Sequence, residues 1–459
     1  MKEPIEIVEA MGSFYRGRKV ILVGQPLSQY ARQIEALHAA GAQRPFVVAS
    51  GPGPGPAPQP PVEHYMVRLS TASHTETSRS TEALLTDPPA ALRAALDAYD
   101  PERTALVLCE ANINVAEFCG RRIADAQPAV LARIADWEEE DRLWATVGVS
   151  RPPSSVVRAE AVELARAHEQ HNLGHGTLWR ADPRAGMHVA MEQTRLVNDP
   201  AEFARAAAWA QSHSERIQVS SFVEGIPVAL NGFVLADGTA VLRPYEELLF
   251  RQGEHLRFAG CSTHFDPSLG DRDHLRGLVA DVGAYLFSTF GFRGAFHVSG
   301  LLGSAGFVPH ALVPRAGSAM GLMTRFLPYL PLMQAVIVHG NDTKLRAADL
   351  EMALLERLES QRCAAIAMHT LVKPDQDVRT LWLVRGENTV RAARGSDHSD
   401  ACLVHSRTEG DGALVALIAG PSFAGLGECV APLVSQAFAL ADERWGTGIG
   451  ALTPAARSH

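Results

Sequence analysis

Short apolar runs alternate with helix-like segments along the first 150 residues of the chain. Residues 18–23, 46–49 and 104–109 are apolar enough for buried strands, and residues 30–40 have the apolar spacing of a helix. Strands that alternate with helices are typical of a parallel α/β sheet. Residues 1–16 are expected to be a partly ordered lead-in to the first strand.

From about residue 151 to 335 the pattern predicts strands and helices of an α+β unit. Strands are expected at 176–179, 191–197, 217–222, 227–235 and 240–243, and helices at 159–167, 201–210 and 275–290. The stretch 292–317 is the most informative part. Apolar strands at 296–302 and 307–313 flank a turn with glycine at both ends, which predicts a hairpin.

Beyond residue 335 the pattern predicts a smaller α+β unit. Helices are expected at 347–360 and 431–442, and strands at 381–385 and 413–419. A chain of 459 residues is too long for one compact core. We therefore expect three domains, and their bounds are 1–150, 151–335 and 336–459.

Charge and composition exclude several classes of partner. The net charge of −9 argues against nucleic acid or an anionic membrane as the main partner, since both favour a basic surface. The chain contains no apolar run of about 18 residues and no signal-peptide pattern at its start. Its six cysteines include no CxxC pair, so we expect mostly buried, reduced thiols in a cytoplasmic protein.

Several local motifs carry no chemistry. No GxGxxG follows the first strand, so a dinucleotide site is not expected. The acidic run 138–141 has the pattern of a solvated helix face. His168, His171 and His175 have the spacing of one helix face, but Gly174 is expected to end that helix, and we interpret them as a polar helix end rather than a metal site.

The order of elements over residues 176–315 resembles the ATP-grasp fold, in which two α+β lobes close on ATP. More specific motifs resemble the actinobacterial peptide ligases of the pheganomycin type. These motifs are 140–144 (EDRLW), 148–153 (GVSRPP), 222–227 (FVEGIP), 243–246 (RPYE), 265–267 (FDP), 293–296 (RGAF) and 439–454. The resemblance extends from about residue 12 to 455. It implies a Rossmann-like pre-ATP-grasp domain, an ATP-grasp core with a linker near 220–226, and a C-terminal domain.

This resemblance also implies a reaction and its participants. A small-molecule carboxylic acid would be joined to the amine of an amino acid or peptide through an acyl phosphate, with ATP consumed and ADP released, in a biosynthetic pathway. The sequence leaves a homodimer open. By resemblance the linker would bind adenine through Ser221, Phe222, Val223 and Glu224. Arg180 and Arg184 would contact phosphates, and the catalytic candidates are Arg243, Glu246, Arg293 and Arg315.

The chain departs from the ATP-grasp pattern at its metal site. The three usual ligand positions hold Ser299, Ala311 and Val313, and the last two have no side-chain oxygen for Mg²⁺. The first lobe also lacks the usual phosphate-binding lysine, because no lysine occurs between residues 150 and 200. Two interpretations stay open, namely a ligase in which Glu246, Glu247 or Asp266 replaces the ligands, and a non-catalytic relative that binds nucleotide, substrate or a partner protein. A third alternative is an unrelated α/β enzyme.

The arginines are open to interpretation as well. Each could orient substrate or phosphate, or could tie loops together by ion pairs.

Overall fold

A parallel four-stranded sheet forms from the N-terminal part of the chain. The computed structural model describes residues 5–53, 55–69, 74–109, 115–134, 136–182, 193–317, 322–324, 327–339, 344–396, 399–407, 412–420 and 422–455. The sheet has the order β3-β2-β1-β4, and all its neighbours are parallel. Its strands are β1 (Val20–Val23), β2 (Phe46–Ala49), β3 (Glu63–Met66) and β4 (Leu106–Cys109). The predicted parallel α/β architecture is therefore confirmed for this part.

The helices of this part of the chain precede its strands, lie between them in sequence or follow the last of them. They are α1 (Ile5–Tyr15), the 3₁₀ helix η1 (Leu27–Tyr30), α2 (Ala31–Ala39), α3 (His74–Thr86), α4 (Ala90–Tyr99), α5 (Pro128–Ile134) and α6 (Trp137–Thr146), and a two-strand ribbon of β5 (Glu117–Phe118) and β6 (Arg121–Arg122) lies between α4 and α5.

The expectation of a partly ordered lead-in was wrong for residues 5–15, which form α1. Ile7, Met11 and Phe14 are buried and spaced as one helix face. The hydroxyl of Tyr15 donates to the carbonyl of Leu332, 2.7 Å away, in a later helix. This helix therefore belongs to the core.

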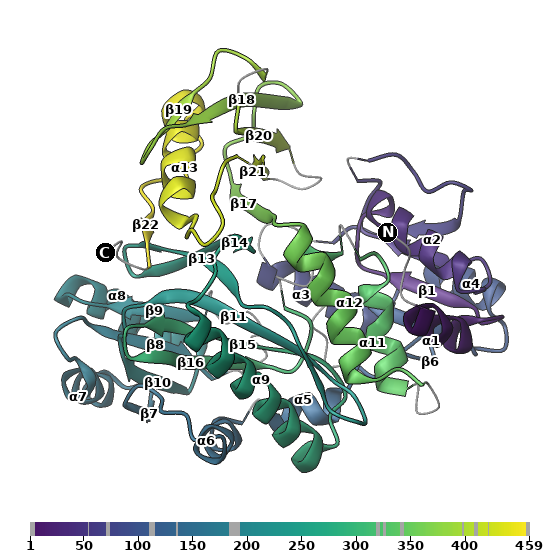
Figure 1. Ribbon diagram of the computed structural model, residues 1–459, viewed down its shortest axis with the longest axis horizontal. Helices are drawn as coiled ribbons and strands as arrows, with labels where there is room; N and C mark the ends of the chain where they lie inside the picture. The colour runs from purple at the N-terminus through teal and green to yellow at the C-terminus, as the bar shows by residue number, and fades with distance from the viewer. Residues whose placement is uncertain are drawn as a thin grey trace.

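A second sheet of sixteen strands, almost entirely antiparallel, runs through the remainder of the chain (Figure 1). Its strands are β7 (Ser154–Arg158), β8 (Thr177–Ala181), β9 (Thr194–Val197), β10 (Arg216–Ser221), β11 (Ile226–Val234), β12 (Thr239–Val241), β13 (Tyr245–Gln252), β14 (His255–Ser262), β15 (Gly294–Gly303), β16 (Gly306–Val313), β17 (Ala364–Thr370), β18 (Val378–Arg385), β19 (Val390–Ala392), β20 (Ala401–Arg407), β21 (Ala413–Ala419) and β22 (Thr453–Pro454). The main path is β16-β15-β11-β13-β14-β17-β21-β20-β18-β19, and β7, β10, β8 and β9 join it where β9 meets β14.

Helices cover this sheet at several places. They are α7 (Ala161–His171), α8 (Pro200–His213), α9 (Leu269–Phe290), α11 (Leu330–His339), α12 (Ala347–Ser360) and α13 (Ala431–Trp445). Asp199 caps α8, because its carboxylate accepts hydrogen bonds from the backbone N–H groups of Ala201 and Glu202. Figure 1 shows α11 and α12 between the N-terminal sheet and the sixteen-stranded sheet, and one apolar cluster joins all three.

Alternation along β11, β13 and β15 gives this part of the sheet two different faces. Val228, Leu230 and Val298 pack in one cluster with α9, which defines the α9 face. Ala229 pairs with both Tyr245 and Ser299, so these three side chains point to the other side. Because Glu247 lies two residues after Tyr245, it shares that side, which we call the Glu247 face.

Two glycines allow the backbone to approach closely around the β15–β16 hairpin. A Cβ on Gly300 would lie 2.4 Å from the ring of Phe307, at a bulge where the register shifts after Ser299. A Cβ on Gly225, in the segment between β10 and β11, would lie 3.1 Å from the carbonyl oxygen of Leu302. The hairpin and the linker are thus held against each other.

The division into three domains stays a prediction. The two sheets are separate, whereas β17 pairs directly with β14, so the C-terminal strands continue the same sheet as residues 154–313.

Candidate functional site

The β15–β16 hairpin brings together the positions that the resemblance assigns to metal ligands. Ser299 on β15 pairs with Ala311 on β16, and His297 pairs with Val313. Only Ser299 among the three ligand positions offers a side-chain oxygen. The positions therefore converge as the resemblance implies, but they form no metal site by themselves.

A partly buried carboxylate lies next to Ser299. The Ser299 hydroxyl donates a hydrogen bond to Oε1 of Glu247, 3.0 Å away, on the Glu247 face. Burial raises the pKa of the Glu247 carboxyl to about 7, although this hydrogen bond acts in the opposite direction. The sequence named Glu247 only as a replacement metal ligand. The alternation of side chains along β13 was the signal that could have placed Glu247 on the same face of the sheet as Ser299.

Glu246, the catalytic candidate beside it, has a different environment. Its two carboxylate oxygens accept hydrogen bonds from the backbone N–H groups of Val430 and Ala431 at 2.7 and 3.1 Å, where α13 begins. A carboxylate at a helix N-terminus satisfies N–H groups that lack partners within the helix. The geometry gives Glu246 a role in attaching α13 to the sheet, and its catalytic role stays a prediction.

Arg180 on β8 lies in a largely buried polar cluster that also contains Glu140, Arg151 and His310. Its guanidinium donates to Oε2 of Glu140 at 2.8 Å and to the carbonyl oxygen of His310 on β16 at 2.9 Å. Arg151 approaches the same Glu140 oxygen at 3.9 Å. We call these four residues the Arg180 cluster. It joins strand β8, helix α6 and the free edge of the β15–β16 hairpin.

The burial of Glu140 contradicts part of the prediction that residues 138–141 form a solvated helix face. Glu138 and Asp141 are exposed, as the solvated-face prediction requires, but Glu140 is buried. Burial alone would raise the pKa of its carboxyl, yet Arg180 and Arg151 outweigh that effect and lower the pKa. The run of four acidic residues concealed this exception, because one turn of a helix presents both a solvent side and a buried side.

The Arg180 cluster retains unused hydrogen-bonding capacity. Within the described residues, Nε of Arg151, Nε of Arg180 and Nε2 of His310 are buried and have no hydrogen-bond partner. Burial and the charge of Arg180 lower the pKa of His310 to about 4, so the imidazole is neutral near pH 7. Buried polar groups without partners are uncommon in folded proteins. This cluster is therefore able to bind a polar ligand.

The linker predicted to contact adenine lies between β10 and β11. The backbone N–H of Ser221 donates to the carbonyl of Pro153, and that of Phe222 donates to the carbonyl of Gly176. The guanidinium of Arg251 lies 5.8 Å from the ring of Phe222. Residues 222–225 belong to neither strand, so Val223 and Glu224 lie outside the sheet ladders.

Three of the other predicted arginines lie at separate places, and Arg184 lies outside the described residues. Arg315 follows β16, and burial lowers the pKa of its guanidinium to about 10, which leaves it charged at pH 7. Its carbonyl accepts a hydrogen bond from Nδ1 of His297, 3.4 Å away. Arg293 precedes β15 and lies 5.9 Å from the ring of Phe287.

Arg243 is buried in an ion-pair network rather than beside Ser299. It pairs with Asp266 and lies 3.2 Å from Glu359 on α12. Asp266 also pairs with Arg362 at 3.2 Å. Asp266, which the sequence had offered as a replacement metal ligand, is therefore surrounded by guanidinium groups.

The histidines of α7 make hydrogen bonds with hydroxyl groups. His168 Nδ1 lies 2.7 Å from Oγ1 of Thr177, and His171 Nε2 lies 2.7 Å from Oγ of Ser155. The helix ends at His171, so His175 does not continue its face. Among the described residues, no group of three or more His, Cys, Asp or Glu side chains could hold a metal ion.

Fewer side-chain oxygens than usual are available to Mg²⁺ at the three ligand positions. Magnesium in phosphate-transfer sites is commonly bound by one or two carboxylates, with phosphate and water completing the shell. Ala311 and Val313 do not fit this requirement. Glu247 and Ser299 together do, because the carboxylate and the hydroxyl already lie within hydrogen-bonding distance of each other.

Solved structures with a similar fold include a synthase, a synthetase and a ligase. N5-carboxyaminoimidazole synthase from Aspergillus clavatus, in complex with ADP and 5-aminoimidazole ribonucleotide, has a TM-score of 0.50 at 12% identity, covering 91% of this chain and 96% of that chain. Phosphoribosylglycinamide synthetase from Anaerococcus prevotii has a TM-score of 0.45 at 13% identity, covering 88% of this chain and 95% of that chain. Phosphoribosylamine–glycine ligase from Thermotoga maritima also has a TM-score of 0.45 at 13% identity, with 92% and 96% covered.

The likeness to the Aspergillus synthase shows that this chain has the ATP-grasp fold, and at 12% identity it shows the fold alone. No protein-family model matches the chain, and no curated protein matches it. Within the described residues, no helix is both long enough and apolar enough to cross a membrane.

Proposed function

We propose that this chain is an ATP-dependent ligase that joins a carboxylic acid to the amine of an amino acid or peptide. The acid's carboxylate oxygen would attack the γ-phosphorus of ATP, the bond between the β- and γ-phosphates would break, and ADP would leave. The amine would then attack the acyl carbon of the acyl phosphate, lose a proton and expel phosphate. The Aspergillus synthase of similar fold contains ADP in its structure, which supports ATP as the cosubstrate.

One observation carries this proposal. Polar groups gather on the Glu247 face, where an apolar core would otherwise be expected. Glu247 and Ser299 form a partly buried pair, and burial together with the charge of Arg315 lowers the pKa of His297, two residues before Ser299. Buried polar and charged groups are costly to maintain without partners. Their concentration at the ligand positions of the ATP-grasp hairpin supports a reaction site there.

Each group would have a distinct task in the reaction. Arg180 and Arg151 would neutralise phosphate charge, in place of the missing lysine. Arg315 would orient the acid's carboxylate and stabilise the charge that develops during transfer. The linker 222–225 would bind adenine through its backbone. Glu247 and Ser299 would hold Mg²⁺, which would supply further neutralisation of phosphate charge.

The test is a product assay on the pure protein. ATP, Mg²⁺ and pooled amino acids and peptides are added, and ADP, AMP and new amide masses are measured. The expected result is ADP together with one or more amides. Arg315→Lys should lower turnover by roughly a hundredfold or more while leaving thermal stability almost unchanged, because lysine cannot form the planar two-point contact with a carboxylate. Equal activity of this variant would remove Arg315 from the site.

A specific observation favours the second candidate, a non-catalytic relative. Ala311 and Val313 occupy two ligand positions and supply no oxygen, and losing charge neutralisation slows phosphoryl transfer by orders of magnitude. Calorimetry separates the two candidates. ATP binding without formation of ADP or amide, over the full set of acids and amines, would favour the non-catalytic relative.

We extend the proposal to the subtype and the domain plan. The motifs of the pheganomycin-type peptide ligases support a peptide or amino acid as the amine and a place in a biosynthetic pathway. Residues 1–150 would be the pre-ATP-grasp domain, 151–335 the ATP-grasp core, and 336–459 the C-terminal domain.

A further inference from the structure

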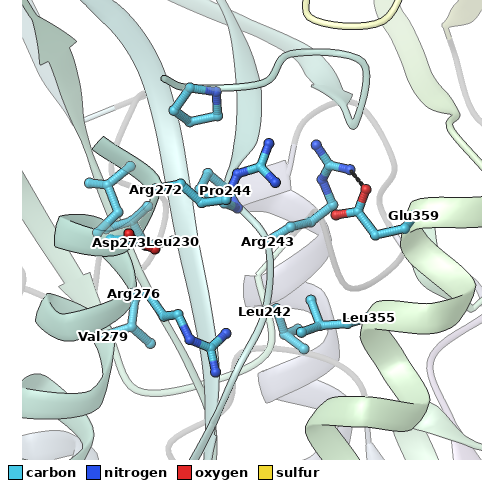
Figure 2. Close-up of a pocket in the computed structure, with 12 residues that line it drawn as sticks. Leu230, Leu242, Arg243, Pro244, Arg272, Asp273, Arg276, Val279, Leu355 and Glu359 are labelled. Carbon is cyan, nitrogen blue, oxygen red and sulfur yellow. Dashed lines mark ion pairs between the residues drawn. The ribbon is translucent and has the colours of Figure 1, made fainter. Parts of the chain in front are cut away.

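A small pocket lies between α9 and α12, over strand β11 and the segment that follows β12 (Figure 2). Its volume is about 160 Å³, and most of its wall is apolar. The apolar lining consists of Leu230, Leu242, Pro244, Pro267, Leu275, Val279 and Leu355. An apolar cavity of about 150 Å³ in a protein core can hold a benzene molecule. This cavity therefore has room for one aromatic ring or one branched aliphatic group.

Charged side chains complete the lining. Arg243, Arg272, Arg276, Asp273 and Glu359 contribute three guanidinium groups and two carboxylates, and Arg276 also pairs with Glu351 beside the pocket. Figure 2 shows the guanidinium group of Arg272 reaching across the cavity toward Arg243. Arg272 approaches Asp266 only at 3.6 Å and is half-exposed. It is therefore able to turn toward a ligand.

Arg243 supplies the second, independent observation. Its side chain is only 4% exposed, and its Nε has no hydrogen-bond partner within the described residues. Asp266 and Glu359 balance its charge from one side, as Figure 2 shows for Glu359. A buried guanidinium N–H without an acceptor is costly, so an acceptor on a ligand would stabilise it.

The cavity is separate from the proposed reaction site. Leu230 and Val279 belong to the apolar cluster on the α9 face, whereas Ser299 and Glu247 lie on the Glu247 face. A ligand in contact with Leu230 and Val279 would thus lie against the α9 face of β11, whereas Ser299 and Glu247 lie on the other face.

We propose that this cavity binds a small carboxylic acid whose apolar body is the size of a benzene ring or a leucine side chain. The ring or branched chain would fill the space between α9 and α12. The carboxylate would accept hydrogen bonds from Arg243 and Arg272. The proposal does not depend on ligase activity, because it rests on the lining between α9 and α12, to which neither Glu247 nor Ser299 contributes.

The test uses benzoate and 4-methylpentanoate as probes in calorimetric titrations of the full chain. Benzamide has the same shape without the charge, and acetate has the charge without the apolar body. We expect benzoate to bind with a dissociation constant of about 0.1–1 mM, and benzamide and acetate to bind at least about tenfold more weakly. Equal binding of benzoate and benzamide would overturn the role of the arginines.

Variants locate the binding. Leu355→Trp fills the cavity from α12 and should weaken benzoate binding at least about tenfold, while Leu371→Trp, at a position that is 84% exposed, should leave it unchanged. If Leu355→Trp does not fold, Leu355→Phe gives the same test with less added volume. Arg272→Gln should weaken benzoate but not benzamide.

Glu247→Gln controls for binding at the reaction site and should leave benzoate affinity unchanged. Absence of benzoate binding, unchanged affinity in the Leu355 variant, or loss of affinity in Glu247→Gln would each overturn the assignment of the site to this cavity.

Discussion

Glu246 and Glu247 are neighbours on β13, and alternation sends their side chains to opposite faces of the sheet. Residue type alone could not tell them apart, and the sequence placed only Glu246 among the catalytic candidates. The difference comes from tertiary partners, which are the start of α13 for Glu246 and Ser299 for Glu247. Both partners are far away along the chain, so no local pattern encodes them.

The two carboxyls predict a pH dependence of stability. Burial raises the pKa of each from 4.5 to about 7, so between these values the folded chain holds more protons than the unfolded chain. Their contribution to the free energy of unfolding therefore falls as pH rises through this window, by up to about 3 kcal/mol each. As pH rises from 4.5 to 7.5, the unfolding free energy of Glu247→Gln should increase relative to that of the wild type, and urea unfolding measures this difference. Parallel curves for the two proteins would show that Glu247 does not titrate in this range.

The histidines do not obscure this comparison. The pKa of His297 and of His310 is lowered to about 4, mainly by burial, so their contribution to stability changes in the opposite direction, rising with pH. Because both histidines are present in the wild type and in Glu247→Gln, their contributions largely cancel in the difference.

Glu140 leads to a second prediction at this scale. It holds Arg180 by an ion pair, and a bound phosphate would compete for the same guanidinium. Glu140→Gln should therefore raise ATP affinity several-fold while lowering the melting temperature, because a buried charge pair loses one partner. Calorimetry and thermal unfolding measure the two effects. Glu138→Gln, on the exposed side of the same helix, is the matched control, and lower ATP affinity in Glu140→Gln would contradict the role of Arg180.

At the scale of single elements, the sequence predicted the strands and helices whose apolar periodicity is clear. The bounds of β2, β21 and α12 agree with expectation because each has a clear apolar period and clear ends. The third strand of the N-terminal sheet, β3, was missed because it is an edge strand with largely exposed side chains. The pair β13–β14 was missed because Glu246, Glu247 and Arg251 interrupt the apolar pattern of β13, and because every second residue in the first half of β14 is exposed.

The β15–β16 hairpin predicts a specific intolerance. In Gly300→Ala the new methyl group would lie 2.4 Å from the Phe307 ring and 2.6 Å from the carbonyl oxygen of Val308. We expect a loss of about 1–3 kcal/mol in unfolding free energy, because a packed core must shift to admit the methyl group. Gly303→Ala on the same strand is the control, since its nearest neighbour would be 3.3 Å away. Chemical denaturation measures both, and equal stability of the two variants would show that the bulge at Ser299 tolerates a side chain.

At the scale of the whole molecule, contacts between distant segments decide what the site contains. The Arg180 cluster joins α6, the loop before β7, strand β8 and strand β16, which no spacing in the sequence connects. Glu246 likewise ties the sheet of the central region to a helix almost 185 residues later. The resemblance to a family could indicate the fold and the hairpin, but it could not show that Arg180 forms an ion pair with Glu140.

The last prediction concerns magnesium and compares the two neighbouring carboxylates. With Ala311 and Val313 at two ligand positions, we assign the ion to the hydrogen-bonded oxygens of Glu247 and Ser299 among the described residues. We therefore expect Mg²⁺ to change ATP affinity by less than about tenfold, which corresponds to roughly 1.4 kcal/mol. Calorimetry with and without Mg²⁺ at pH 8, where Glu247 is mostly ionised, measures this difference.

Glu247→Gln should abolish the remaining Mg²⁺ effect with little loss of stability. Glu246→Gln should keep the Mg²⁺ effect and instead lower the melting temperature, because the first N–H groups of α13 lose a charged acceptor. ATP binding that depends strongly on Mg²⁺ and survives Glu247→Gln would contradict this assignment, since the metal would then be held by groups other than this pair. The opposite responses of two adjacent residues would place the metal on the Glu247 face and separate catalysis from the attachment of the C-terminal helix.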